Sequence, residues 1–212
     1  MSMIRLLHQY QAEKRAETIR SGCLFRTRSK LQIDFLNFSV SDVRLEDIAA
    51  GLSKLCRYTG QCERFYSVAE HCTLGSRLPE LDLFCVLGQA TGPRDPKLSK
   101  SFFVHDSPEA YLGDANAPLK ALLPGYKLIE ERFESVIDEA FSLDVSIGHE
   151  TVKRLDRLMY LREDDELMES RGECPAELYD LIPELPCWSP DEAKKAFLER
   201  AEELGIVCPS MR

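Results

Sequence analysis

Apolar residues recur at helical spacing along most of this chain. Ile48, Leu52 and Leu55 share one face of a predicted helix, and Glu46 and Asp47 lie in its first turn, where the helix dipole favours acidic side chains. The same pattern predicts helices over residues 1–20, 43–56, 66–78, 81–90, 98–106, 126–142 and 150–169, with a short last helix after Ser189.

Proline and glycine set the expected helix boundaries. Pro79 is expected to stop the helix before it, because proline lacks the backbone donor that a helix needs. Ser107 is interpreted as an N-cap, with Pro108 in the first helical position. Gly113 and Pro118 bound the short piece that follows.

The last helix has the clearest start, because Ser189, Pro190 and Glu192 form a capping-box pattern. One stretch has a different period: apolar and polar residues alternate over 31–35, which indicates a short strand or an extended arm. With so little strand signal, we predict an all-α protein of about seven to nine helices.

Length and charge limit the classes of function. A chain of 212 residues and 24.1 kDa favours a single domain over 1–212 with a substantial core. The 36 acidic residues exceed the 27 basic ones, for a net charge of −9, which argues against binding a nucleic-acid polymer. A small phosphorylated ligand is compatible with this charge, because local cations or a metal reverse the field inside a pocket.

No segment reaches the roughly 18 consecutive apolar residues that a membrane-spanning helix needs, so no membrane partner is expected. The eight cysteines are scattered and include no Cys-x-x-Cys pair. We therefore expect reduced thiols in a cytoplasmic protein.

Two histidines stand out from the helical pattern. His71 shares a helix face with apolar neighbours, and an imidazole that points inward needs a hydrogen-bond partner or a metal. His105 and Asp106 follow the apolar run 102–104, which carries a carboxylate towards the interior. A buried carboxylate is costly unless it meets a cation. For a lone buried histidine, the ordinary explanation is a hydrogen-bonded core side chain.

Asp156 projects from the edge of an apolar stripe over 152–159. Taken alone, it is explained by an ion pair with Arg154 or Arg157. Together with His71 and His105-Asp106 it completes a set of two imidazoles and two carboxylates from three helices, which suits Mn2+, Fe2+, Co2+ or Zn2+. Spacing alone does not establish that these residues meet in space.

The order His71, His105-Asp106, Asp156 resembles the H…HD…D signature of the HD-domain metal-dependent phosphohydrolases. The stretches 65–71, 105–114 and 117–120 resemble, more narrowly, the bacterial 5′-deoxynucleotidases and the phage-type dATP triphosphohydrolases. The resemblance covers about residues 43–168 and leaves an N-terminal extension, 1–42, and a C-terminal helical tail, 170–212, outside. It implies an HD-type helical bundle with a divalent transition metal (Co2+, Mn2+, Zn2+ or Fe2+) held by His71, His105, Asp106 and Asp156.

The resemblance also assigns roles to a second acidic pair, Glu109 and Asp114. Glu109 lies within one helical turn of Asp106, where it can orient the attacking water or take its proton. Asp114 would protonate the departing nucleoside oxygen. The alternative explanations are an exposed helix residue for Glu109 and a turn former for Asp114.

Phosphate binding needs cations, and the resemblance points to Arg57, Lys120 and Lys153. Arg57 precedes His71 by fourteen positions, and Lys153 lies one helical turn before Asp156. The alternative for each is an exposed, solvated side chain.

The expected activity is hydrolysis of phosphate from 5′-(deoxy)nucleotides by a metal-activated water. Two alternatives stay open: hydrolysis of the alarmone guanosine tetraphosphate at its 3′-pyrophosphate, and a non-catalytic module that senses nucleotide or holds a structural metal. Analogy with the family also implies a homo-oligomer. Candidate packing surfaces for a second copy are the apolar residues Ile4, Leu7, Phe35, Leu36 and Phe38.

Overall fold

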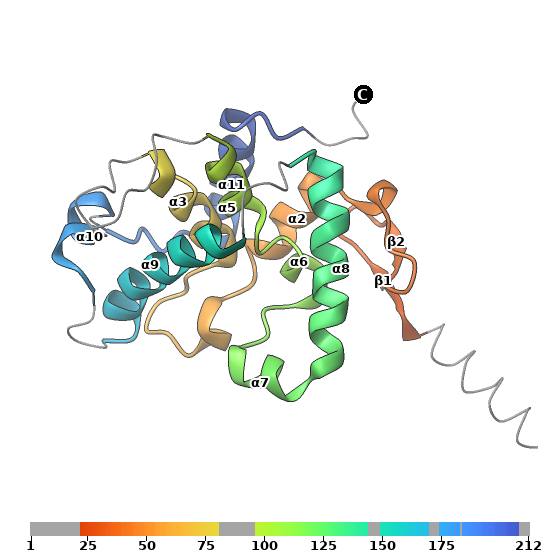
Figure 1. Cartoon of the computed structure of the whole chain (residues 1–212), viewed down its shortest axis with the longest axis horizontal. Coiled ribbons are helices and arrows are strands. Elements are labelled where there is room, and N and C mark those ends of the chain that lie inside the picture. Colours follow the sequence, from red (N-terminus) through yellow and green to blue (C-terminus); the bar gives the residue numbers. More distant parts are fainter. Residues whose placement is uncertain (1–21, 81–95, 144–148, 170–173, 183, 208–212) are drawn as a thin grey trace, which may run out of the picture.

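A computed structural model of the chain describes residues 22–80, 96–143, 149–169, 174–182 and 184–207. This part is mostly helical, with one small two-stranded sheet (Figure 1), which confirms the predicted predominance of helix. The helices predicted over 1–20 and 81–90 lie outside the described residues. In the part described, no helix combines the length and apolar character needed to cross a bilayer.

The elements follow one another along the chain as a hairpin and then helices. The strands β1 (Leu24–Arg26) and β2 (Gln32–Asp34) pair antiparallel, which confirms the strand alternative for the alternating stretch. The α-helices are α2 (Leu45–Leu52), α3 (Val68–Gly75), α5 (Pro96–Val104), α6 (Glu109–Leu112), α7 (Ala117–Leu122), α8 (Pro124–Phe141), α9 (His149–Leu167), α10 (Ala176–Leu181) and α11 (Pro190–Glu203). Short 3-10 helices cover Val40–Asp42, Arg57–Gly60 and Leu78–Glu80.

Two helices are shorter than predicted. The stretch 43–56 is helical over Leu45–Leu52 only, and the stretch 66–78 over Val68–Gly75 only. Pro79 is therefore not the residue that stops α3, because it lies beyond the helix in the 3-10 turn. The Arg200 side chain of α11 donates to both the hydroxyl and the carbonyl of Ser76, and these bonds stabilise the chain where α3 ends.

The predicted start of the following short helix is wrong by one position. Helix α6 begins at Glu109, with Pro108 in the capping position. Ser107 instead lies in the turn before it, where its carbonyl accepts from the Ala110 amide and its side chain is fully buried. The capping box at Ser189 is confirmed: the Ser189 hydroxyl accepts from the Glu192 amide, and the Glu192 carboxylate accepts from the Ser189 amide.

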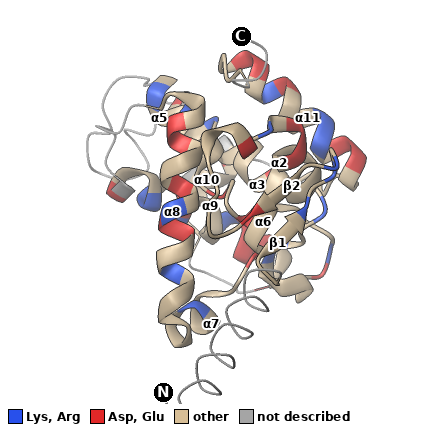
Figure 2. Ribbon diagram, turned by 90° about the vertical axis from the view of Figure 1, so that its right-hand side faces the viewer, with Lys and Arg blue, Asp and Glu red and all other residues tan. Residues whose placement is uncertain are grey.

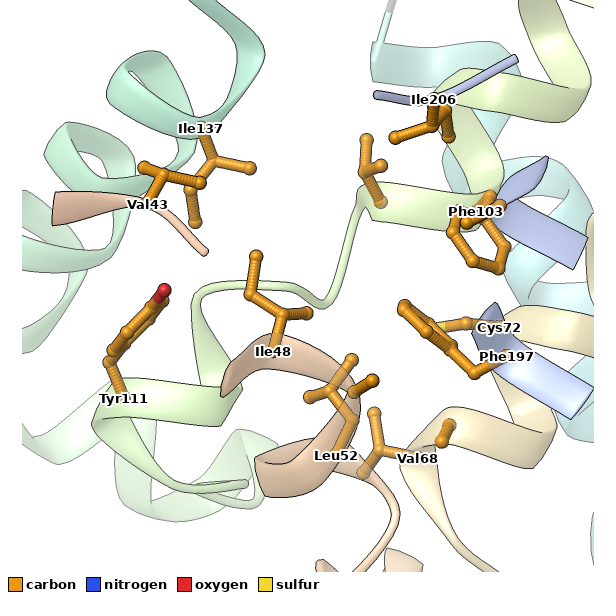
Figure 3. Close-up of a cluster of buried hydrophobic side chains, with 14 of the residues drawn as sticks. Val43, Ile48, Leu52, Val68, Cys72, Phe103, Tyr111, Ile137, Phe197 and Ile206 are labelled. Carbon is orange, nitrogen blue, oxygen red and sulfur yellow. The ribbon is translucent and has the colours of Figure 1, made fainter. Parts of the chain in front are cut away.

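The main hydrophobic core lies among α2, α3, α5, α8 and α11 (Figure 3). Phe103 of α5 stacks on Phe197 of α11 with ring centroids 4.2 Å apart. Residues outside 43–168 also supply this core, including Ile33, Phe38 and much of α11. Phe38 is fully buried there and Phe35 packs against it, so these two side chains are used within the chain rather than left for a second copy.

A second apolar cluster packs α9 against α3 and α5. Phe102 of α5 belongs to this cluster, whereas its neighbour Phe103 belongs to the first. Helix α5 is therefore held on two sides. Because α3 contacts both α5 and α11, the backbones that carry His71 and His105 are fixed by packing on either side.

The C-terminal segment is tied to the middle of α3. The two carboxylate oxygens of Glu70 accept the backbone amides of Cys187 and Trp188, at 2.7 and 2.8 Å. These two residues directly precede Ser189, the cap of α11. The C-terminal part of the chain is thus bonded near α3 at two places: the segment before α11 binds Glu70, and Arg200 of α11 binds Ser76.

Helix α3 packs closely against α5 at Gly75. A Cβ atom at this position would lie 2.2 Å from a ring carbon of Phe102, which is fully buried. The same ring lies against His71 and His105, with centroid distances of 5.5 and 4.7 Å. The absence of a side chain at Gly75 therefore sets how near the two histidine-bearing helices come.

Replacing Gly75 with alanine is expected to lower the free energy of unfolding by about 1–3 kcal/mol, because the methyl group overpacks the contact with Phe102. Gly125 in α8 is the matched control, since nothing lies within 4 Å of a Cβ there. The Gly125→Ala variant should be neutral or slightly stabilising. Urea unfolding of both variants measures the difference, and equal midpoints would contradict the close packing.

Candidate metal centre

Four predicted ligands from three parts of the chain meet at one point. His71 comes from α3, His105-Asp106 from the end of α5, and Asp156 from α9. The Nε2 atom of His71 is 3.2 Å from Asp156 Oδ1 and 3.7 Å from Asp106 Oδ2. The Nε2 atom of His105 is 3.1 Å from Asp106 Oδ1 and 3.9 Å from Asp156 Oδ1. Spacing alone could not establish this convergence.

The Nδ1 atom of each of these two imidazoles has a hydrogen-bond partner outside the set of four ligands. His71 Nδ1 is 2.6 Å from Glu163 Oε1, and His105 Nδ1 is 2.6 Å from the carbonyl oxygen of Phe102. A carboxylate and a carbonyl only accept hydrogen bonds, so Nδ1 carries the hydrogen in each ring. The Nε2 atom of each ring then faces the carboxylates of Asp106 and Asp156, where it can bind an ion once it carries no hydrogen. Histidine ligands of metals are oriented by this kind of partner.

Both Nε2 atoms are buried and make no hydrogen bond within the described residues. Their contacts with the carboxylates are ion-pair distances without hydrogen-bond geometry. A buried polar atom left unpaired costs free energy, and a cation at this point would pair with both nitrogens and both acids. Ligands that share an ion at about 2.1 Å lie roughly 3 Å apart, close to the separations here. The donor set therefore fits a metal ion, and one ligand atom each of His71, His105 and Asp106 lies within 4.8 Å of the other two.

The charges around His71 favour a proton in the metal-free chain. Burial and the neighbouring Arg57 lower the pKa of His71, but Glu163 and Asp156 outweigh them and raise it to about 9. Burial raises the pKa of Asp156, and the close approach and positive charge of His71 overcome this and lower it. A metal ion binding here has to displace a proton.

Arg57 is placed beside the centre by local pairing of the chain. Cys56 and Ser67 form an isolated β-bridge, and the Arg57 amide donates to the carbonyl of Tyr66, so the residue lies next to the start of α3. Its side chain is only 15% exposed. Arg57 Nε donates to Glu163 Oε2 at 3.0 Å, and Nη1 lies 3.5 Å from Asp106 Oδ2.

Glu109 is a buried carboxyl next to the ligands. Its Oε1 atom is 3.6 Å from Lys120 Nζ, and its buried Oε2 atom has no hydrogen-bond partner in the described chain. Burial raises the pKa of Glu109 well above its ordinary value, and the charges of Asp106 and Asp114 add to this. The exposed-helix explanation for Glu109 is therefore wrong.

A cavity of about 180 Å³ opens beside the ligands. It is lined by His105, Asp106, Pro108, Glu109, Lys120, Glu130, Glu134, Val152, Lys153 and Asp156. Lys120 is held in the wall by a 2.6 Å contact from its Nζ to Glu130 Oε1. Lys153 is exposed to solvent but faces the same cavity, so both predicted lysines are near the ligands.

Asp114 is half-buried and is not among the residues that line this cavity. Burial raises its pKa, the charge of Arg57 opposes this, and the nearby carboxylate of Asp106 adds to the rise. Asp114 is therefore within electrostatic reach of the centre.

A larger hollow of about 890 Å³ shares Glu130, Glu134 and Lys153 with the cavity and continues along α8. Figure 2 shows both acidic and basic segments along this helix. Acidic residues outnumber basic ones in the lining, which consists of Lys127, Glu130, Glu131, Glu134, Ser135, Asp138, Glu139, Ser142, Leu143 and Lys153. Negative potential there makes the few lysines important for an anionic ligand.

Glu163 is a site residue that the sequence analysis did not identify. It is fully buried and contacts both His71 and Arg57. Its position offers one signal: it follows Asp156 by seven residues, which places it two turns further along the same face of α9.

No family model matches the chain. It is 35% identical over 173 residues to the uncharacterized protein YfdR of Escherichia coli, which covers 77% of this chain and 85% of YfdR. The chain belongs to the YfdR family. It is also 35% identical over 121 residues to the uncharacterized protein RCAP_rcc00048 of Rhodobacter capsulatus, covering 56% of this chain and 58% of that protein. Neither name states an activity.

Divalent-ion binding by this YfdR-family protein is expected to strengthen as the pH rises. The pKa of His71 is about 9 in the metal-free chain, against an ordinary 6.5. At a pH below about 9, a proton on His71 competes with the ion. This competition weakens as the pH rises towards that value. Calorimetric titration with Mn2+ in buffers of different ionisation enthalpy measures both affinity and proton release. Constant affinity without proton release would contradict the proposed role of His71.

Proposed function

We propose that this protein is an HD-type metal-dependent phosphohydrolase that removes phosphate from 5′-(deoxy)nucleotides. One observation carries the proposal: His71, His105, Asp106 and Asp156 converge, and the buried carboxyl of Glu109 lies next to them on the cavity wall. The motif resemblance of the sequence supports the same reaction class.

The four converging residues would hold the ion, and their mixed nitrogen and oxygen donors suit Mn2+, Fe2+, Co2+ or Zn2+. When bound, the ion supplies the positive charge that polarises a phosphoryl oxygen and acidifies the attacking water. The protein's own groups orient the reactants and move the protons.

Glu109 is the proposed general base. A carboxyl whose pKa is raised by burial binds a proton more strongly than an exposed one, and Oε2 has no competing partner in the described chain. Oε2 would receive the proton of the water that attacks phosphorus. Asp114, whose pKa is also raised, would supply a proton to the departing nucleoside oxygen.

Arg57, Lys120 and Lys153 are the proposed phosphate-binding cations. Arg57 presents a planar set of donors that matches phosphate oxygens. Lys120 shares the cavity wall with Glu109, so phosphate bound by Lys120 would lie beside the proposed base. These cations offset the acidic residues of α8 where the substrate enters.

The alternative of a purely structural metal is supported less well. A closed structural site has its coordination filled by the protein and needs no further acid beside an open cavity. Glu109 and the cavity it lines favour catalysis. Guanosine tetraphosphate stays the alternative substrate, and a panel of substrates separates it from nucleotides.

Replacing His105 or Asp106 with alanine is expected to reduce phosphate release to background while circular dichroism still reports a helical fold. Each change removes a ligand and leaves the remaining charges unbalanced. A malachite-green assay with Mn2+ or Co2+ measures release from nucleoside mono-, di- and triphosphates and from guanosine tetraphosphate. Asp191→Ala, on the exposed face of α11, is the control. Undiminished turnover in the ligand variants would overturn the proposal.

Replacing Glu109 with glutamine is expected to lower kcat by about 10²–10⁴-fold while metal binding is retained, because glutamine cannot accept the proton. The pH profile of kcat should lose the limb that reports this group. Glu199→Gln is the matched control, since its side chain is 62% exposed on α11, away from the cavity lining. An unchanged kcat in Glu109→Gln would exclude Glu109 as the base.

A further inference from the structure

Glu163 contacts both a proposed metal ligand and a proposed phosphate-binding residue. Its carboxylate is fully buried in α9. Oε1 is 2.6 Å from His71 Nδ1, and Oε2 accepts from Arg57 Nε at 3.0 Å. One side chain therefore contacts a candidate metal ligand with one oxygen and a candidate phosphate-binding residue with the other.

Both contacts are of a kind that fixes orientation. The bond to Nδ1 determines which nitrogen of His71 carries the hydrogen and which one is left for a metal. The bond to Nε limits rotation of the Arg57 side chain, whose Nη1 atom lies 3.5 Å from Asp106 Oδ2. A carboxylate suits this place because it accepts at both oxygens, which neither an amide nor a hydroxyl can do in this geometry.

Burial explains why the two contacts depend on each other. An isolated carboxylate in the interior is strongly unfavourable, and here it is balanced by the guanidinium of Arg57 and by the imidazole of His71. A change in the position or charge of one partner alters how strongly Glu163 holds the other. The three side chains form one electrostatic unit.

We propose that Glu163 is a positioning residue that couples metal binding at His71 to phosphate binding at Arg57. This inference rests on the proposed function. Glu163 keeps the His71 hydrogen on Nδ1, so that Nε2 faces Asp106 and Asp156, and it holds Arg57 at the edge of the same centre. Because coupling of two binding sites is reciprocal, bound metal tightens phosphate binding and bound phosphate tightens metal binding.

The Glu163→Gln variant tests the metal side of this coupling. An amide has one accepting oxygen and one donating nitrogen, so it can serve His71 or Arg57 but not both. If its nitrogen faces His71, the ring hydrogen moves to Nε2, where the metal should bind. Calorimetric titration of Mn2+ into the metal-free full-length chain is expected to show a 10–100-fold weaker affinity.

Glu150→Gln is the matched control for this substitution. Glu150 lies on the same helix, its side chain is 76% exposed, and it pairs with Arg154 one turn away. The control should bind Mn2+ as the unaltered protein does. Equal affinity in Glu163→Gln and the control would overturn the positioning role.

Inorganic phosphate tests the coupling itself. In the unaltered protein, saturating phosphate is expected to tighten Mn2+ binding by about 5-fold or more. In Glu163→Gln this factor should fall towards one. If the factor is the same in both proteins, Glu163 does not couple the two sites, whatever its effect on metal affinity.

Histidine NMR provides a test that needs no variant, and it decides the matter should Glu163→Gln fail to fold. With 15N-labelled histidine and Zn2+ bound, His71 is expected to carry its hydrogen on Nδ1 and to coordinate through Nε2. Coordination through Nδ1 would overturn the proposal and leave the hydrolase untouched. An unaltered protein that binds no divalent ion would overturn both the proposed function and this inference.

Discussion

The centre of this protein is organised by the cost of burying charge. His71 and Glu163 are completely buried, and the side chains of Arg57 and Asp106 are 15% and 18% exposed, in a region packed between two apolar clusters. Burying each of these groups costs free energy, and the cost is offset because a group of opposite charge or matching hydrogen-bond capacity faces it. The helices α3, α5 and α9 must therefore keep their relative positions, and the close packing of Gly75 against Phe102 constrains the first two.

The sequence predicts the parts of the structure that depend on local patterns. Apolar spacing located most helices, and the Ser189 capping box located the start of α11. The helix ends that depend on distant residues were missed: α3 ends before Pro79, where Arg200, 124 positions from Ser76, binds the chain. Propensity and spacing carry no information about such a contact.

The candidate site, too, could be predicted from the sequence only in part. Residue type and apolar neighbours singled out His71 and His105-Asp106. Asp156, taken alone, was better explained by an ion pair with Arg154 or Arg157. In the structure, Arg154 pairs with Glu150, while Asp156 lies beside His71. Glu163 escaped notice because its partners, His71 and Arg57, come from other elements. The partners of one carboxylate on a charged helix can be identified only once the packing of that helix against its neighbours is known.

The attachment of the C-terminal segment to Glu70 has a consequence for biosynthesis. Glu70 directly precedes His71, and it is held by the amides of Cys187 and Trp188, which are made late. A nascent chain that has released α3, α5 and α9 still lacks these two bonds to α3. The two bonds to Glu70 therefore form only after residues 187 and 188 have left the ribosome, later than the helices that carry the four candidate ligands.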